Sequence, residues 1–304
     1  MNNIKRMALM LLLGLFVISA QAQLLYRISG KDLKQPSYII GTYHFANVHF
    51  VDSIPGLKDA MATTQQVYGE LDMQDMLSQE NIVKYMAAMM LPEGKSLKDV
   101  LSAEQLAKLN AFLTTNLGAD LTNPMVEQQM GRFTPIALET QLEVVSIFKA
   151  HPGDFDPQNG LDEYFQKEAR QAGKTVGGLE TLDFQIKTLF TSQPLERQVE
   201  GLMCFIDHND QQTAQVEDVI KAYYAQDLKK VGEAMDEKFN NECDATEEEK
   251  ATMIYNRNAD WLTKLPAIMT AKPTLVVVGA GHLPGDKGVL EGLRKQGYTV
   301  EGVK

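Results

Sequence analysis

The stretch Pro273-Thr-Leu-Val-Val-Val-Gly279-Ala-Gly-His282 carries the strongest strand signal in this chain of 304 residues. Residues 274–278 form an unbroken apolar and β-branched run, which is typical of a strand buried on both faces. A second stretch, Pro36-Ser-Tyr-Ile-Ile-Gly41-Thr-Tyr-His44, follows the same plan near the other end of the chain. Each has a Pro, an apolar strand and a Gly-x-x-His motif. We interpret them as two strands of one sheet that meet at one site; a chance match is the alternative.

Strand-like sequence is concentrated at the two ends of the chain, and helical sequence fills the middle. Further short β-prone runs lie at residues 24–28, 66–71, 174–179 and 298–300. Strands that alternate with helices favour a parallel sheet covered by helices. We therefore predict an α/β fold with a central, mostly parallel sheet from both chain ends and a large helical middle region packed over it.

The first 22 residues have the pattern of a cleaved signal peptide. Lys5 and Arg6 precede an apolar run at residues 7–18, and Ala20-Gln21-Ala22 is a small-x-small cleavage site. The run is too short for a stable membrane span. The sequence near the cut contains no Cys that could carry a lipid anchor. We predict a periplasmic or secreted protein without membrane insertion. Residues 23–304 would form a single domain with helical insertions at about 73–172 and 183–271.

The chain is acidic, with a formal net charge of −11. This charge argues against nucleic acid and anionic membranes as partners, which leaves a peptide or a small molecule as the expected substrate. Only two cysteines occur, Cys204 and Cys243, and whether they pair is left open because sequence does not give their separation. Phosphate-binding loops, serine nucleophile elbows and His-Glu-x-x-His motifs are absent from the sequence. The pattern does not indicate an oligomeric state.

Four polar residues closely follow strand candidates: His44, Glu70, Glu180 and His282. If these strands are parallel, the four side chains converge outside the carboxyl ends of the sheet, where open α/β sheets bind ligands. Two imidazoles and two carboxylates are a suitable ligand set for a divalent ion such as Mn, Co or Zn. Alternatively, one group activates a water as general base while another stabilises developing charge.

Each of these residues also has a simpler interpretation. A single His after a strand is often a hydrogen-bonded turn residue, and a single Glu there often complements a helix dipole. The occurrence of both histidines in matching strand-Gly-x-x-His contexts favours a functional role, because His44 and His282 are two of only five histidines in the chain.

Arg257 and Asn258 lie in a helical stretch with Ile254, Trp261 and Leu265. The spacing puts Asn258 on the apolar face of that helix, where an unpaired amide is costly. We expect Asn258 to bond a partner, at the crevice or elsewhere in the core, and Arg257 to hold a carboxylate.

Several short motifs together resemble the TraB/GumN family over nearly all of residues 24–304: Gly41-Thr-Tyr-His44, Glu70-Leu-Asp72, Gly178-Leu-Glu180, Asn256-Arg-Asn258 and Val278-Gly-Ala-Gly-His-Leu-Pro-Gly285. That family is similar to the Tiki metalloproteases and, more distantly, to erythromycin esterases and the haem-binding ChaN proteins. The resemblance implies a metal-dependent hydrolase, with peptide cleavage the best-attested activity. Both motif histidines and Glu70 match family positions, as do Glu180, Arg257 and Asn258, whose roles the resemblance leaves open.

Two hypotheses follow. In the first, the protein is a metal-dependent hydrolase, most simply a peptidase. His44 and His282 ligate the ion with help from Glu70 or Glu180, the other carboxylate activates water, and Arg257 with Asn258 orients the substrate or the ligands. In the second, the protein is a non-catalytic periplasmic binding protein that holds haem or a signalling peptide in the same crevice.

Overall fold

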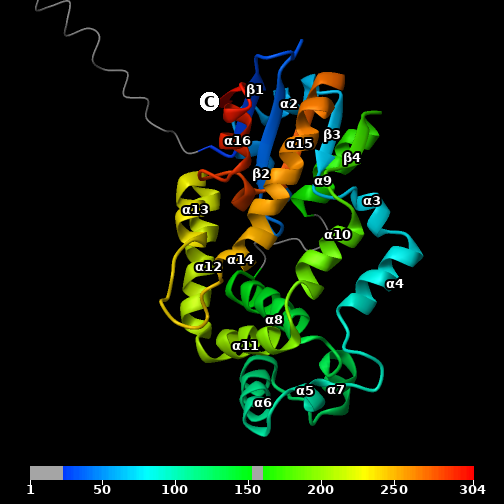
Figure 1. Cartoon of the computed structure of the whole chain (residues 1–304), viewed down its shortest axis with the longest axis vertical. Coiled ribbons are helices and arrows are strands. Elements are labelled where there is room, and N and C mark those ends of the chain that lie inside the picture. The colour runs from blue at the N-terminus through cyan, green and yellow to red at the C-terminus, as the bar shows by residue number, and fades with distance from the viewer. Residues whose placement is uncertain (1–22, 153–159) are drawn as a thin grey trace, which may run out of the picture.

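A computed structural model describes residues 23–152 and 160–304 of the chain. The expected signal peptide, residues 1–22, lies outside the described residues. A six-stranded sheet with covering helices occupies one end of the molecule, and a group of helices occupies the other (Figure 1). Within the described ranges, no helix is both long enough and apolar enough to cross a membrane.

The sheet has the strand order β4-β3-β5-β2-β1-β6. Its strands are β1 (Leu25–Ser29), β2 (Ser37–Thr42), β3 (Gln66–Gly69), β4 (Thr175–Gly178), β5 (Thr274–Gly279) and β6 (Thr299–Gly302). Neighbouring strands among β2, β5, β3 and β4 pair in parallel, whereas β1 pairs antiparallel with β2 and with β6. The prediction of a mostly parallel sheet from both chain ends is therefore confirmed.

The central pair of the sheet, β2 and β5, carries the two Gly-x-x-His motifs. Residues 275–278 of β5 are fully buried, as expected for a β-branched strand covered on both faces. In the register, Gly41 of β2 lies opposite Val278 of β5. A Cβ atom on Gly41 would approach the Cα atom of Ala280 to 2.9 Å, so this position needs glycine. The tight pairing brings the two motifs side by side.

Strand β3 is shorter than predicted and ends at Gly69 rather than Leu71. Beyond the strand, the carbonyl of Glu70 still accepts the backbone N–H of Glu180 at 2.9 Å, and the carbonyl of Leu71 accepts a hydrogen bond of 2.7 Å from the Gln166 side chain. Glu70 thus stands directly at the end of the strand, at the edge of the sheet.

Helices α2 (Leu57–Thr63), α9 (Leu161–Gln171), α15 (Asn256–Ala271) and α16 (Val289–Lys295) pack against the sheet. Their apolar side chains share one core with the strands, and the largest are Phe165 of α9 and Trp261 of α15. In the view of Figure 1, α15 crosses over the sheet. The α9 and α15 helices are the ends of the two predicted insertions, so both insertions return to the sheet.

Most of the remaining helices lie below the sheet in Figure 1, whereas α3 lies beside α9, and α12 and α13 contribute apolar side chains to the core of the sheet. A separate apolar core, which includes Leu109, Leu138 and Leu202, joins α5, α6, α8 and α11. These remaining helices are α3 (Met73–Met76), α4 (Gln79–Ala88), α5 (Leu97–Val100), α6 (Ala103–Leu117), α7 (Pro124–Met130), α8 (Pro135–Ala150), α10 (Leu182–Ile186), α11 (Leu195–Asp207), α12 (Asn209–Tyr224), α13 (Leu228–Met235) and α14 (Glu247–Lys250).

Cys204 and Cys243 form a disulfide, with their Cα atoms 5.4 Å apart. The bond ties α11 to the segment between α13 and α14 and answers the pairing question that the sequence left open. Among connecting segments, the π-helical turn η3 (Ala251–Tyr255) leads directly into α15, and the short 3-10 helix η4 (Ala280–His282) follows β5.

Candidate active site

The carboxyl ends of the parallel strands β2, β5, β3 and β4 lie along one edge of the sheet. His44 lies two residues beyond β2, Glu70 directly follows β3, and Glu180 lies two residues beyond β4. His282 ends η4, just after β5. Three of these side chains, Glu70, Glu180 and His282, are joined in one buried network, whereas His44 has its own partner.

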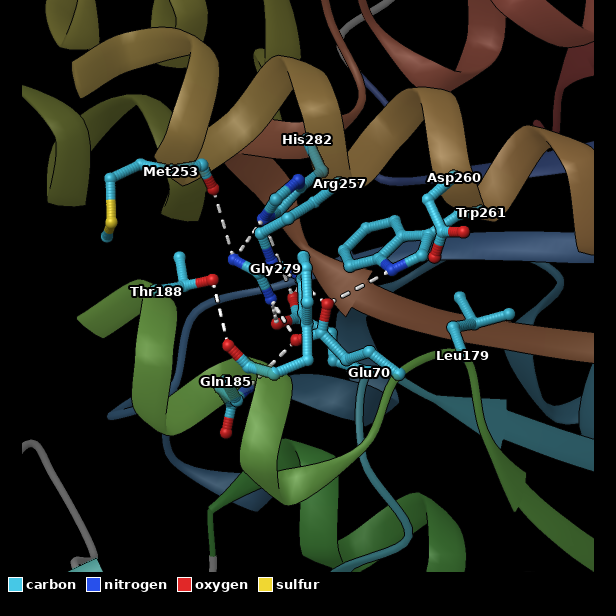
Figure 2. A network of polar contacts seen from close by, with 12 residues as sticks. Glu70, Leu179, Gln185, Thr188, Met253, Arg257, Asp260, Trp261, Gly279 and His282 are labelled. Atoms are coloured by element: carbon cyan, nitrogen blue, oxygen red, sulfur yellow. Dashed lines mark hydrogen bonds and ion pairs between the residues drawn. The ribbon is translucent and has the colours of Figure 1, made fainter. Parts of the chain in front are cut away.

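Arg257 is the centre of the buried network, which Figure 2 shows. Its guanidinium holds Glu180 through two hydrogen bonds, from Nε to Oε2 at 3.0 Å and from Nη2 to Oε1 at 2.6 Å. Nη2 also donates to Glu70 Oε2, and Nη1 donates to the carbonyl of Met253 and faces His282 Nε2, each at 3.2 Å. The Arg257 side chain is only 5% exposed. One buried cation therefore pairs with the carboxylates that follow two neighbouring strands.

Asn258 fixes the tautomer of His282. Its amide nitrogen donates to the carbonyls of His282 and Lys287 at 3.1 and 3.0 Å. Carbonyls only accept, so Asn258 Oδ1 must be the atom that faces His282 Nδ1 at 2.7 Å, and Nδ1 must carry the proton. Burial lowers the pKa of His282 to about 4, which keeps the ring neutral. The lone pair is consequently on Nε2, the atom that points toward Glu70 and Arg257.

Glu70 lies next to that lone pair. Its Oε1 accepts the backbone N–H of Gly279 at 2.8 Å and lies 3.8 Å from His282 Nε2. Burial acts against ionisation, but the positive charges of Arg257 and His44 and the hydrogen bond from the Gly279 N–H outweigh it and hold the pKa of Glu70 below its ordinary value. Glu70 is therefore an ionised carboxylate whose side chain is only 11% exposed.

Glu180 has both oxygens engaged. Besides Arg257, they accept hydrogen bonds from Trp261 Nε1 and from the Gln185 side chain, each at 3.2 Å. The side chain is only 2% exposed. As it lies here, Glu180 holds Arg257 rather than facing open space.

His44 differs from His282 in surroundings and charge. Its side chain is 64% exposed, and Nδ1 lies 2.7 Å from Asp162 Oδ2. The charge of Asp162 and this hydrogen bond raise the pKa of His44 to about 9. The hydroxyl of Thr42 donates to the other oxygen of Asp162 at 2.9 Å. With Nδ1 held by the carboxylate, Nε2 is the remaining nitrogen of the ring.

Asp162 is a site residue that the sequence reasoning missed. It lies in the first turn of α9, where a carboxylate is common on any helix because it complements the helix dipole. Its partners Thr42 and His44 are separated from it by 120 and 118 residues. Neither the local pattern nor the spacing distinguishes it from Glu163 beside it.

The geometry suits two ligands of one metal ion. Nitrogen and oxygen ligands lie about 2.0–2.2 Å from an ion such as Zn²⁺, so two of them are separated by roughly 3–4 Å. The 3.8 Å between His282 Nε2 and Glu70 Oε1 falls in this range. Within the described ranges 23–152 and 160–304, only one group of three residues has its ligand atoms within 4.8 Å of one another. That group is His208, Glu242 and Cys243. The Cys243 sulfur is in the disulfide and is not free to ligate.

Residues 24–302 match the model of the TraB/PrgY/gumN family. The chain belongs to this family. It is 27% identical to metalloprotease TIKI2 of Danio rerio, 24% to the metalloprotease TIKI homolog of Nematostella vectensis and 26% to metalloprotease TIKI1 of Homo sapiens. Each match covers 88% of the chain and 58%, 65% and 59% of these relatives respectively. The chain thus spans less than two thirds of their length. No solved structure matches it.

Proposed function

We propose that the protein is a metal-dependent hydrolase that cleaves peptides. The carrying observation is the pair formed by His282 Nε2, with its lone pair fixed by Asn258, and the ionised Glu70 at 3.8 Å. The match to relatives named metalloproteases supports the same reaction class. Residues 1–22 would direct export, so that residues 23–304 act in the periplasm or outside the cell.

In this proposal, His282 and Glu70 hold a divalent ion. The ring nitrogens of His44 do not lie within 4.8 Å of both of these ligand atoms in the structure, so His44 would move closer to become the third ligand. Nitrogen and carboxylate donors without thiolates suit Mn, Co or Zn. When bound, the ion would lower the pKa of a bound water and polarise the scissile carbonyl. An ion on His282 Nε2 would replace the hydrogen bond from Arg257 Nη1, while the bonds of Arg257 to Glu70 and Glu180 use Nη2 and Nε.

The remaining residues orient the ligands. Arg257 fixes Glu70 through Oε2 and leaves Oε1 directed toward His282, and Glu180 in turn fixes Arg257. Asn258 holds the His282 ring, and Asp162 holds the His44 ring, each through Nδ1. Such contacts raise the basicity of a ligating histidine and reduce the rearrangement on binding. We therefore assign Glu180, Arg257 and Asn258 to positioning rather than to direct contact with substrate.

Elemental analysis and a peptide-library assay test the proposal. We expect the purified protein to retain Mn, Co or Zn after dialysis, to lose peptide cleavage in chelator, and to regain it with one of these ions. His282→Ala and Glu70→Gln should abolish both retention and cleavage. His49→Ala, which changes a histidine outside the network, is the matched control. Cleavage that persists in chelator and in His282→Ala would overturn the proposal.

A haem titration of the wild type and of His44→Ala tests the binding-protein hypothesis. A haem titration that shifts the Soret band in the wild type and not in His44→Ala, together with no cleavage of any library peptide, would establish that hypothesis in place of a hydrolase.

A further inference from the structure

Two further side chains that commonly ligate metals lie beside the disulfide. The ligand atoms of His208, Glu242 and Cys243 all lie within 4.8 Å of one another, and Cys243 is bonded to Cys204. Two sulfurs, an imidazole and a carboxylate therefore converge at the C-terminal end of α11. The candidate active site lies elsewhere, after the parallel strands of the sheet, and its donors include no sulfur.

One helix presents two of these donors. Cys204 lies in the last turn of α11, and His208 follows the helix, with its backbone N–H bonded to the carbonyl of Cys204 at 2.9 Å. Residues four positions apart lie on the same face of a helix. Histidines with this spacing hold one ion in helical zinc motifs. The helix therefore places one sulfur and one imidazole side by side.

The other two donors are held next to α11 by more than the disulfide. Glu242 and Cys243 lie in the segment between α13 and α14. Arg197 of α11 donates to the carbonyl of Glu242 at 3.2 Å and to that of Asp244 at 3.4 Å. The same guanidinium pairs with Glu249 at 2.7 Å. The segment therefore keeps bonds to α11 when the sulfur–sulfur bond is opened.

The imidazole of His208 and the carboxylate of Glu242 face each other without pairing. Within residues 23–152 and 160–304, neither group makes a hydrogen bond or an ion pair, although their ligand atoms lie within 4.8 Å of each other. His208 is half-buried, so its ring is partly removed from water that could serve as its partner. A cation between the two groups would engage the lone pairs of both.

Two cavities give access to this group. They have volumes of about 1300 and 250 Å³, and both are lined by Cys243 and by Glu139 of α8. Cys204, in contrast, is only 7% exposed. Opening a disulfide needs the attack of a thiolate on one of its sulfurs, and Cys243 is the accessible partner. The same route admits a metal ion.

The spacing of the donors is close to that of a tetrahedral zinc site. Zinc binds sulfur at about 2.3 Å and nitrogen or oxygen at about 2.0–2.2 Å, so neighbouring ligand atoms lie roughly 3–4 Å apart. The present group is within 4.8 Å, and small side-chain rotations would close the difference. With their Cα atoms 5.4 Å apart, Cys204 and Cys243 can separate their sulfurs by rotation about the Cα–Cβ bonds. Two thiolates with an imidazole favour zinc over the harder ions Mg²⁺ and Ca²⁺.

We propose that the reduced protein binds one Zn²⁺ ion through Cys204, His208, Glu242 and Cys243. A dithiol reductant opens the bond by exchange: it transfers two electrons and two protons to the cysteines and is itself oxidised to a disulfide. The ion then displaces the two thiol protons into solvent and binds both thiolates, the imidazole and the carboxylate. Disulfide formation and metal binding thus exclude each other at these cysteines. The inference is independent of the proposed hydrolase function.

Cobalt(II) is the probe, because it occupies tetrahedral zinc sites and gives a thiolate-to-cobalt charge-transfer band in the near ultraviolet. The purified protein is reduced with a phosphine, which is oxidised to its oxide, and is titrated with cobalt without oxygen at neutral pH. We expect the band to saturate at one ion per chain after reduction, to be absent from the oxidised protein and to disappear when zinc is added. Cobalt at the candidate active site gives no such band, since no thiolate lies there.

Variants locate the ligands. His208→Ala and Glu242→Gln each keep both cysteines and should weaken cobalt binding to the reduced protein about tenfold or more. His49→Ala and Glu237→Gln, which remove donors outside the group, are the matched controls and should leave the affinity unchanged. His282→Ala should also keep the band, so loss of the proposed active-site ion and loss of this one are distinguishable.

The emission of Trp261 shows whether the reduced chain is folded, because it is the single tryptophan and is fully buried. We expect the short-wavelength emission of a buried indole in the cobalt-bound, reduced protein. No band after reduction, a band of the same strength in the oxidised protein, unchanged affinity in either ligand variant, or a band that appears only with an exposed Trp261 would overturn the proposal.

Discussion

The two Gly-x-x-His segments leave adjacent strands and yet stabilise their histidines in opposite ways. His282 is buried, neutral and held by the amide of Asn258, whereas His44 is exposed and held by the carboxylate of Asp162. One imidazole is thus fixed by packing and neutral hydrogen bonds, and the other by charge. Similar sequence motifs can therefore be stabilised by different interactions, because the partner residues come from elsewhere in the chain.

The difference extends to neighbouring charges. The His282 segment lies against Arg257, which pairs with two carboxylates, Glu70 and Glu180. The His44 segment has one carboxylate, part-buried Asp162, as its counter-charge. Perturbing the first segment should therefore affect folding, and perturbing the second should affect mainly protonation and ligand binding.

The largest effect is expected from Arg257→Met, which keeps the aliphatic packing and removes the buried charge. Glu70 and Glu180 are then left buried without their counter-ion, and the free energy of unfolding should fall by about 3–5 kcal/mol. Urea denaturation measures the loss. Adding Glu70→Gln and Glu180→Gln to this variant should recover a large part of it. Arg27→Met, which removes an exposed ion pair with Glu301, should change stability by less than about 0.5 kcal/mol.

The histidines themselves give the next contrast. His282→Ala leaves Asn258 Oδ1 without its donor and opens a space beside Trp261, so we expect a loss of about 2–4 kcal/mol. His44→Ala should cost less than about 1 kcal/mol because the ring is exposed. Both are measured in chelator by urea denaturation. Equal losses in stability would contradict the comparison, whereas both variants should lose peptide cleavage if the proposed function holds.

Opposite titrations are expected for the two rings. In metal-free protein followed by NMR, His44 should titrate near its raised pKa of about 9, and His282 near its lowered pKa of about 4. The His44–Asp162 pair then contributes stability that is full below the ordinary His pKa of about 6.5 and is lost as pH rises through 9. Asp162→Asn should move the His44 midpoint back toward 6.5 and leave His282 unchanged. A His44 midpoint near 6.5 in the wild type would refute the role given to Asp162.

The smallest effect is expected from Thr42→Val, which keeps the side-chain shape and removes the hydrogen bond to Asp162. The free energy of unfolding should fall by about 1 kcal/mol. Thr63→Val, a change at an exposed helical threonine that bonds only backbone carbonyls, is the control and should have a smaller effect. A loss in Thr42→Val as large as that in His282→Ala would show that Asp162 is anchored more tightly than its part-buried setting implies.

The strands and the four strand-end residues could be predicted because each depends on local sequence. An apolar β-branched run, a glycine and a polar residue fit within about ten positions, and parallel pairing then brings the ends together. The position of Asn258 on an apolar helix face also indicated that its amide needs a partner, and Arg257 was expected to hold a carboxylate. The structure adds that Arg257 holds two of them.

Other features depend on contacts that no local pattern encodes. Asp162 lies on α9, 118 residues beyond His44, and its carboxylate resembles any first-turn acid in sequence. The engagement of Glu180 by Trp261 and Arg257 likewise arises from the placement of α15. The cavity beside Glu139 is formed by helices distant in the chain, and the disulfide joins cysteines 39 residues apart.

The pairing of β2 with β5 has a consequence for how activity arises during synthesis. The side chain of Ser37 bonds the backbone of Thr274 across 237 residues at the start of this pair, so the centre of the sheet closes only when nearly the whole chain is available. Such long-range closure carries a large entropic cost and is slow. Every N-terminal fragment that stops before β5 lacks half of the site. If the proposed function holds, a chain that is still being synthesised therefore cannot assemble the site, because His282 follows β5.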